Sequence, residues 1–446
     1  MKKLLGLLLA AAMLAALLAG CGGASKAAET TAAAETTAAA SGAADTTAAS
    51  AAETTAAASG EPAEISFITW RSEDADVLKQ MISDFEAKNP DVKVNLEVTS
   101  SDMTEYYTVL KSRLTSGEGA DVLAVHPGPY IKELADAGSL LELTDTDLIG
   151  SMDAGVLSGG QVDGKQYGLP ETYNSFAIYY NKDIFTKLGI TPPTDYASLV
   201  DACKKSADAG YMPVAAGFGE SWVTEILYEA LMCSYAGGDD NVLHSLETGD
   251  AKLTDDVYKS VFGDVQKMIS DGVFQDNVLG TKYDSSISLF ASGKSAMLMD
   301  GTWSIGNLKS LNADLNFGLV NIPSVSGAAV GPVSPGQNIA INAKGGKIDA
   351  AKKFVAYLFS KEGEEAYCNG TSQTSTVNGT TLSVPEMDMV SSLTSGTTAT
   401  WPDVFVENAK LLSTLDDLCA RLCSPGADLT AELTKSQKEI DALNAG

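Results

Sequence analysis

Histidine is nearly absent from this chain, and the short motifs that mark many hydrolytic enzymes are missing. Only two histidines occur in 446 residues, which leaves little material for Ser-His-Asp chemistry. Neither Gly-x-Ser-x-Gly nor His-Glu-x-x-His is present. The segment from Gly159 to Lys165 imitates a phosphate loop, but Gln166 stands where serine or threonine is needed. These absences argue against an enzyme.

Basic residues are also scarce. The chain has 30 lysines and arginines against 58 aspartates and glutamates, and its net charge is −28. Such acidity disfavours direct contact with nucleic-acid phosphates and with anionic membrane surfaces, and it favours solubility. We therefore expect no nucleic-acid partner.

The cysteines predict neither a disulfide framework nor a complete metal site. Cys419 and Cys423 lie one helical turn apart, but two ligands without a nearby histidine do not complete a zinc site. A run beginning at Asp145 resembles a calcium loop, but Val156 replaces the twelfth-position glutamate. We expect no metal and no cofactor. Apart from Cys21 the cysteines are odd in number, so at least one stays free, and most are expected in the core: Cys203, Cys233, Cys368, Cys419 and Cys423.

The N-terminus has the composition of an export signal. A basic start at Lys2-Lys3 precedes an apolar run from Leu4 to Ala19, which is too short for a confident membrane span. The run ends in Leu-Ala-Gly-Cys, which matches the lipobox of bacterial lipoproteins, so residues 1–21 resemble a lipoprotein signal with Cys21 as the lipidated residue. Diacyl attachment supplies the two chains that stable anchoring requires. The alternative is a plain secretory signal with an incidental cysteine.

Residues 22–63 consist almost entirely of alanine, threonine, serine and acidic residues. With no bulky apolar side chain to bury, conformational entropy favours a disordered spacer. About forty residues of flexible coil span roughly 35 Å. The spacer would lift the globular part off the membrane.

The globular part starts near Glu64 and alternates strands with amphipathic helices. The alternation predicts strands at Ile65–Thr69, Val92–Val98 and 121–125, with loops at Trp70 and His126 after two of them. Such alternation is typical of a parallel sheet covered by helices, where ligands gather at the carboxyl ends of the strands. The length exceeds the roughly 300 residues at which one core usually divides, so two lobes are expected.

The stretch from Gly164 to Pro193 predicts a crossing between these lobes. It reads as a strand at 165–169, a turn at 171–174, a buried strand at 175–180 and a helix at 183–188. The order is therefore strand, hinge, strand, helix.

This stretch contains the segments GKQYGLP, YYNKDIF and KLGITPP. Their order and spacing resemble those of the family of bacterial extracellular solute-binding proteins that includes the maltose-binding protein. A second family-like block, SLFASGKSAMLMDGTWSIGNL, runs from Ser288 to Leu308. The resemblance implies a two-lobed α/β fold of type II, with a mostly parallel sheet flanked by helices in each lobe and the ligand in the cleft between them. It places 64–172 and 339–375 in the first lobe, and 173–338 and 376–446 in the second.

The resemblance also implies a function. Members bind a sugar or oligosaccharide by hinge closure and deliver it to the transmembrane subunits of an ABC permease, without catalysis. We expect a monomer on the extracellular face of the cell membrane, anchored to the bilayer only through Cys21, in an envelope of the single-membrane type. Two alternatives stay open: a surface sensor or adhesin on the same fold, and a secreted glycoside hydrolase, which needs only two carboxylates.

Tryptophan is rare, and each of the four lies at a predicted element boundary: Trp70, Trp222, Trp303 and Trp401. An aromatic ring can cover the flat C–H face of a sugar while polar side chains bond its hydroxyls. The resemblance implies that Trp303, in a Gly-x-Trp motif, stacks on carbohydrate. For any one of these tryptophans the alternative is packing in the core.

The polar candidates are expected in the loops around these rings. By resemblance, the turn at 171–174 also carries ligand contacts. Arg71 and Glu73 could equally form an exposed ion pair. The complete set of polar candidates is Arg71, Glu73, His126, Glu171, Tyr173, Asn174, Glu220 and Asp284.

Overall fold

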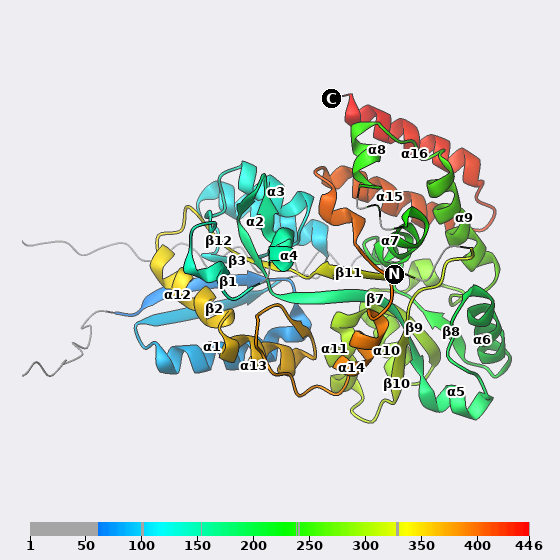
Figure 1. The fold of residues 1–446 in the computed structure, drawn as a ribbon, viewed down its shortest axis with the longest axis horizontal. Helices are drawn as coiled ribbons and strands as arrows, with labels where there is room; N and C mark the ends of the chain where they lie inside the picture. Colours follow the sequence, from blue (N-terminus) through cyan, green and yellow to red (C-terminus); the bar gives the residue numbers. More distant parts are fainter. Residues whose placement is uncertain are drawn as a thin grey trace, which may run out of the picture. The chain divides into compact units, whose positions relative to one another are not determined.

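A computed structural model describes residues 61–99, 102–152, 154–237, 239, 241–326 and 330–445 (Figure 1). The predicted signal peptide, Cys21 and all but the last three residues of the predicted spacer lie outside the described residues. Within these ranges, no helix has the length and apolar character needed to cross a membrane.

The first sheet has the strand order β2-β1-β3-β12-β6. β1 pairs in parallel with β2 and β3, whereas β12 pairs antiparallel with β3 and β6. Its strands are β1 (Ala63–Thr69), β2 (Val92–Val98), β3 (Val122–Val125), β6 (Gly168–Pro170) and β12 (Asn338–Ile341).

Helices cover both faces of this sheet because side chains of β1 alternate between them. Phe67 points into a core formed with α1, α12 and α13, while Ile68 points into a second core formed with α2 and α3. The helices are α1 (Ala75–Lys88), α2 (Met103–Ser116), α3 (Pro129–Asp136), α12 (Ile348–Leu358) and α13 (Lys361–Thr371).

The second sheet has the order β14-β11-β7-β9-β8, and β10 and β13 also pair with β7. Figure 1 shows β7 as the long strand that enters it. Its strands are β7 (Thr172–Asn181), β8 (Met212–Ala215), β9 (Ser295–Gly301), β10 (Phe317–Val320), β11 (Gly331–Pro335), β13 (Thr374–Ser375) and β14 (Thr398–Thr400).

The pairing of β7 corrects one detail of the predicted fold class. β7 runs antiparallel to β9, β10, β11 and β13, and only β8–β9 and β11–β14 are parallel pairs. The two-lobed α/β fold is confirmed, but both sheets are mixed instead of mostly parallel. Two of the four strand pairs in the first sheet and four of the six in the second are antiparallel. β7 comes directly from the first sheet without a crossover helix of its own, so no connection forces it to run parallel to its neighbours.

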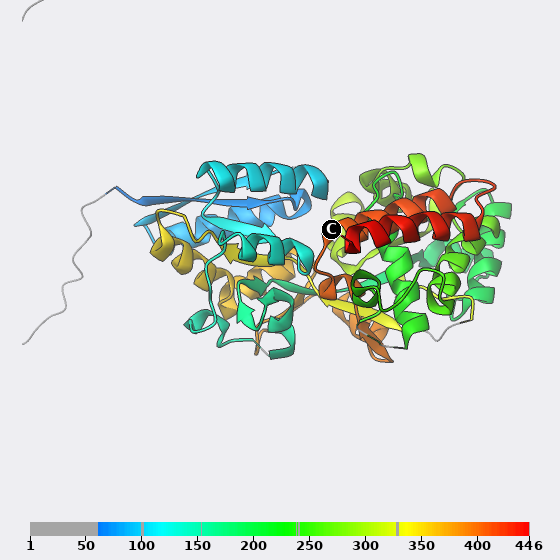
Figure 2. The same ribbon diagram turned by 90° about the horizontal axis from the view of Figure 1, so that it is seen from above.

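One large core joins the helices of the second lobe to its sheet. Figure 2 shows α15 and α16 lying side by side in this lobe. The helices are α5 (Lys182–Leu188), α6 (Tyr196–Asp208), α7 (Val223–Ala236), α8 (His244–Thr248), α9 (Asp256–Ser270), α10 (Tyr283–Ala291), α11 (Ile305–Leu311), α14 (Met387–Leu393), α15 (Ala409–Leu422) and α16 (Leu429–Asn444).

Short elements complete the described chain. A small hairpin precedes β6, and single helical turns join the larger elements. They are α4 (Ala154–Leu157), β4 (Gln161–Val162), β5 (Lys165–Gln166), η1 (Ser72–Asp74), η2 (Asp147–Ile149), η3 (Ser158–Gly160), η4 (Val278–Gly280), η5 (Thr302–Ser304) and η6 (Pro402–Phe405).

The chain passes between the sheets at β6–β7, at β11–β12 and at α13–β13. At the first crossing only Glu171 separates the two strands, so the predicted turn at 171–174 is wrong. Tyr173 pairs with Pro335 on one side and with Thr374 on the other. Backbone partners on both sides keep this segment extended.

Candidate functional site

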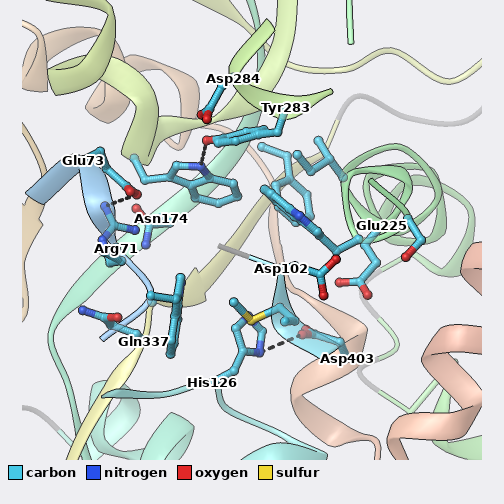
Figure 3. Close-up of a pocket in the computed structure, with 18 of the residues that line it drawn as sticks. Arg71, Glu73, Asp102, His126, Asn174, Glu225, Tyr283, Asp284, Gln337 and Asp403 are labelled. Carbon is cyan, nitrogen blue, oxygen red and sulfur yellow. Dashed lines mark hydrogen bonds and ion pairs between the residues drawn. The ribbon is translucent and has the colours of Figure 1, made fainter. Parts of the chain in front are cut away.

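A cavity of about 430 Å³ lies between the two lobes, and elements of both contribute to its wall (Figure 3). From the first lobe come the loop after β1, the start of α2 and the loop after β3. From the second lobe come β7, α7, α10, α11 and α15 together with η5 and η6. The cavity therefore changes shape whenever the lobes move relative to one another.

The loops at the ends of β1 and β3 enter this cavity as predicted. Trp70, Arg71 and Glu73 follow β1, and His126 follows β3. Because β1 and β3 are parallel, their carboxyl ends meet at one edge of the sheet.

Aromatic rings form the second-lobe side of the cavity. Trp401 stacks on Phe176 with ring centroids 3.9 Å apart, and Trp303 meets both rings edge-on at 5.9 and 6.0 Å. Trp222 tilts against Tyr283 at 4.8 Å. Trp303 and Trp222 are half-buried, so part of each ring faces the cavity.

Hydrogen bonds hold Trp303 in place. Its indole N–H donates to the hydroxyl of Tyr283 at 2.8 Å, and this hydroxyl also lies 2.9 Å from that of Ser304. Ser304 in turn donates to buried Asp300. The ring is therefore oriented before any ligand arrives, which lowers the entropic cost of binding.

Trp70 provides an aromatic surface on the first-lobe side. It is half-buried and meets Tyr106 edge-on at 5.0 Å. All four tryptophans of the chain thus line this one cavity.

Arg71 is not part of an exposed ion pair, which corrects that alternative. Its side chain is 9% exposed and lies 3.4 Å from Glu73. Its Nε donates to the carboxylate of Asp74, and Asp74 also accepts a bond of 2.6 Å from the hydroxyl of Tyr367. These contacts fix the guanidinium at the cavity wall.

Four carboxylates from three elements gather at another part of the wall. Glu225 and Glu229 lie one turn apart on α7, Asp403 lies in η6 and Asp416 lies on α15. Figure 3 shows Asp403 beside His126, with Glu225 on the same side of the view. The closest approach between His126 Nδ1 and Asp403 Oδ2 is 3.8 Å.

Burial governs the protonation of this acidic group. It raises the pKa of Glu225 and Glu229 well above the ordinary range, and repulsion from Asp403 and Asp416 acts in the same direction. It raises the pKa of Asp403 to about 7. Burial lowers the pKa of His126 to about 4, so the imidazole is neutral at pH 7 and supplies no positive charge here.

The structure brings nine of the twelve predicted ligand-binding residues to the cavity wall. Those nine are Trp70, Arg71, Glu73, His126, Asn174, Trp222, Asp284, Trp303 and Trp401. Glu171, Tyr173 and Glu220 are outside this wall. Whether the nine contact a ligand remains a prediction.

The three residues outside the wall have other surroundings. Glu171 is buried at the first crossing and accepts a bond from Gln337, and Tyr173 lies within the paired part of β7. Glu220 accepts bonds from the Trp222 indole at 3.4 Å and from the backbone N–H of Tyr283 at 3.2 Å. It supports two rings of the cavity from behind.

Many residues of the cavity wall were not predicted from the sequence. The one local signal it could have used is the pair Glu225 and Glu229, since two acids one turn apart are unusual in so apolar a helix. The missed residues discussed above are Phe176, Glu225, Glu229, Tyr283, Asp403 and Asp416, and Asp102, Tyr130 and Gln337 also line the cavity.

The sequence matches the family of bacterial extracellular solute-binding proteins over residues 70–365. The chain belongs to this family. The resemblance stated from the sequence is thereby confirmed.

Several relatives of this solute-binding protein carry sugar-binding names. It is 26% identical over 308 residues to the multiple sugar-binding protein of Streptococcus mutans, covering 68% of this chain and 72% of the relative. It is 28% identical over 267 residues to the galactooligosaccharide-binding protein of Bacillus subtilis, covering 58% and 60%. A solved chitin oligosaccharide binding protein superposes with a TM-score of 0.76 at 21% identity, covering 87% of this chain and all of that one. The structural likeness supports the fold.

The solute-binding protein has few groups suited to metal or thiol chemistry. In the described ranges, no set of three or more histidine, cysteine or acidic side chains is placed to hold a metal ion. The five cysteines in those ranges are buried and form no disulfide. What the cavity offers a ligand is aromatic surface and hydrogen-bonding groups.

Proposed function

We propose that this protein is the lipid-anchored extracellular binding component of an ABC importer, and that it captures a sugar or oligosaccharide between its lobes and delivers it to the permease. The observation that carries the proposal is the convergence of all four tryptophans, with buried polar side chains between them, on one cavity. Ring faces suit the C–H faces of sugars, and the polar groups suit hydroxyls. The names of the two relatives support the same ligand class.

The charge of the wall argues against an anionic ligand. Among the described residues, Arg71 is the only lysine or arginine on the wall, and Asp74 and Glu73 already pair with it. One relative, from Agrobacterium fabrum, is named for binding sn-glycerol-3-phosphate. A phosphate in this cavity would meet strong repulsion. The acids on the wall are Glu73, Asp102, Glu225, Glu229, Asp284, Asp403 and Asp416.

Hinge closure would couple binding to delivery. A ligand that touches both lobes favours the closed arrangement by its difference in affinity for the two states. The three crossings are the natural hinge, since each carries the described chain from one sheet to the other. The closed arrangement would then present a surface that the permease recognises.

Isothermal titration calorimetry with a broad panel of neutral mono- and oligosaccharides tests the proposal. At least one member should bind with micromolar or tighter affinity, and a hundredfold excess over its dissociation constant should stabilise the protein by about 2.7 kcal/mol. Small-angle scattering should show a more compact particle with that sugar present. A panel without heat or thermal stabilisation for any carbohydrate would overturn the proposal.

A further inference from the structure

The acidic part of the wall has more carboxyl groups than carbohydrate hydroxyls require. Their raised pKa values reflect burial and mutual repulsion that no cation offsets. Four carboxyl groups face the same cavity: Glu225, Glu229, Asp403 and Asp416. The charges of the two aspartates raise the pKa of both glutamates. Glu229 and Asp403 are each 1% exposed and Asp416 is 6% exposed. Water therefore screens this charge poorly.

No basic side chain of the protein balances this group. Among the described residues, no lysine or arginine forms an ion pair with any of the four carboxylates, and the sole histidine near them is His126, 3.8 Å from Asp403. Tyr228 donates one hydrogen bond of 3.1 Å to Asp416. This bond, together with protons shared among the four carboxyl groups, does not satisfy every acceptor oxygen of the group.

Two of the unused acceptors are buried. Glu229 Oε1 and Asp403 Oδ1 receive no hydrogen bond from any described residue. A buried acceptor without a donor costs about 1 to 3 kcal/mol, and more when it is charged. A metal ion is a poor candidate for the missing partner, because the described acids lack a metal-binding arrangement. A cationic donor would supply the missing hydrogen bonds and would also favour the ionised form of these acids, whose pKa burial raises.

We propose that the carboxylates Glu225, Glu229, Asp403 and Asp416 form a subsite for a protonated amine on the bound carbohydrate, so that the natural ligand is an amino sugar or an oligosaccharide containing one. This inference rests on the proposed function, whose ligand class it narrows. An alkylammonium group carries three donors, one positive charge and no acceptor. A neutral hydroxyl supplies one donor and no charge, so it would not favour ionisation of the group.

Calorimetry at pH 7 with matched trimers tests the subsite. The β-1,4-linked trimers of glucosamine, N-acetylglucosamine and glucose differ only in the substituent at C2. Maltotriose and its 6-amino-6-deoxy derivative provide the same comparison with α-linkages. In at least one series the amine should bind ten or more times tighter than its neutral counterparts.

Substitutions of the acidic residues test whether these residues cause the preference for the amine. Glu225→Gln and Asp416→Asn should each reduce the ratio of amine to neutral affinity to about threefold or less. Asp417→Asn is the matched control, since Asp417 is the exposed neighbour of Asp416 on α15 and undergoes the same change of charge. It should keep the wild-type ratio. The melting temperature of each ligand-free variant verifies that the variant folds. If a variant does not fold, the comparison of amine and neutral trimers with the wild-type protein still tests the subsite.

The outcomes separate this inference from the proposed function. Neutral trimers that bind as tightly as the amines overturn the subsite and leave carbohydrate binding intact. A preference for the amine that persists in both Glu225→Gln and Asp416→Asn also overturns it. A wild-type protein that binds no amine and no neutral sugar of any panel overturns both proposals.

Discussion

The side-chain amide of Gln337 donates a hydrogen bond to the carboxylate of Glu171, and the backbone N–H of Glu171 donates to the carbonyl of Gln337 at 2.9 Å. Each residue lies on a different crossing between the sheets. Burial raises the pKa of Glu171 to about 8, although the bond from Gln337 acts in the opposite direction. A titratable group therefore lies between two of the crossings that join the sheets.

We predict that the empty protein becomes less stable as the pH rises from about 4.3 to about 8. The folded state keeps a proton on Glu171 up to its raised pKa, whereas the unfolded chain releases that proton near about 4.3, so stability falls between these values. Burial also raises the pKa of Asp300 and Glu364 to about 7, which acts in the same direction. Glu171→Gln should flatten the profile of melting temperature against pH. The exposed Glu118→Gln should not; a wild-type slope in Glu171→Gln would refute the assignment.

Trp303→Ala should weaken binding of the sugar identified by calorimetry at least tenfold, or about 1.4 kcal/mol. The substitution removes a ring whose position Tyr283 fixes. Trp303→Phe keeps an aromatic face but loses the N–H donor, so its loss should be smaller. Tyr357→Ala is the control, because this half-buried ring lies on α12 outside the cavity wall. Unchanged affinity in Trp303→Ala would remove the residue from the ligand site.

Asp74→Asn should lower the free energy of unfolding by about 3 kcal/mol, since it removes the main partner of the buried Arg71 guanidinium. Tyr367 loses its charged acceptor as well. Asp76→Asn is a matched control in the first turn of α1, where the side chain is 97% exposed. Urea unfolding measures both. Equal stability of the two variants would show that the Arg71 pair contributes little.

Cys21→Ala should move the protein from the membrane fraction to the medium and abolish incorporation of labelled fatty acid. The lipobox around Cys21 is the reason. Cys423→Ala, which changes a buried thiol, should leave both readouts as in the wild type. A Cys21→Ala protein that stays in the membrane fraction would show that another segment anchors it.

Local patterns predicted the elements that depend on neighbouring residues. The helix predicted at 183–188 is observed as α5, and the side chain of Asn181 caps it by accepting from the backbone N–H groups of Asp183 and Ile184 at 3.1 and 3.0 Å. The loops at Trp70 and His126 were predicted because parallel strands end at one edge. These features require no knowledge of distant contacts.

Other features depend on long-range packing, and few local sequence patterns indicate them. Glu225 and Asp416 are 191 residues apart, and only the packing of α7 against α15 brings them together. The strand conformation at Tyr173 depends on Pro335 and Thr374, which lie 162 and 201 residues further along the chain. Glu220 was expected at the ligand, whereas it supports Trp222 and Tyr283 from outside the cavity.

The placement of every tryptophan on one wall has a practical consequence. Indole emission responds to nearby polarity and to quenching by carboxyl and amide groups, and here no indole outside the cavity contributes a constant background. Intrinsic fluorescence should therefore follow the occupancy of the cleft directly, without a dye or an engineered reporter. Stopped-flow traces of that emission could resolve ligand encounter from the lobe closure that we propose.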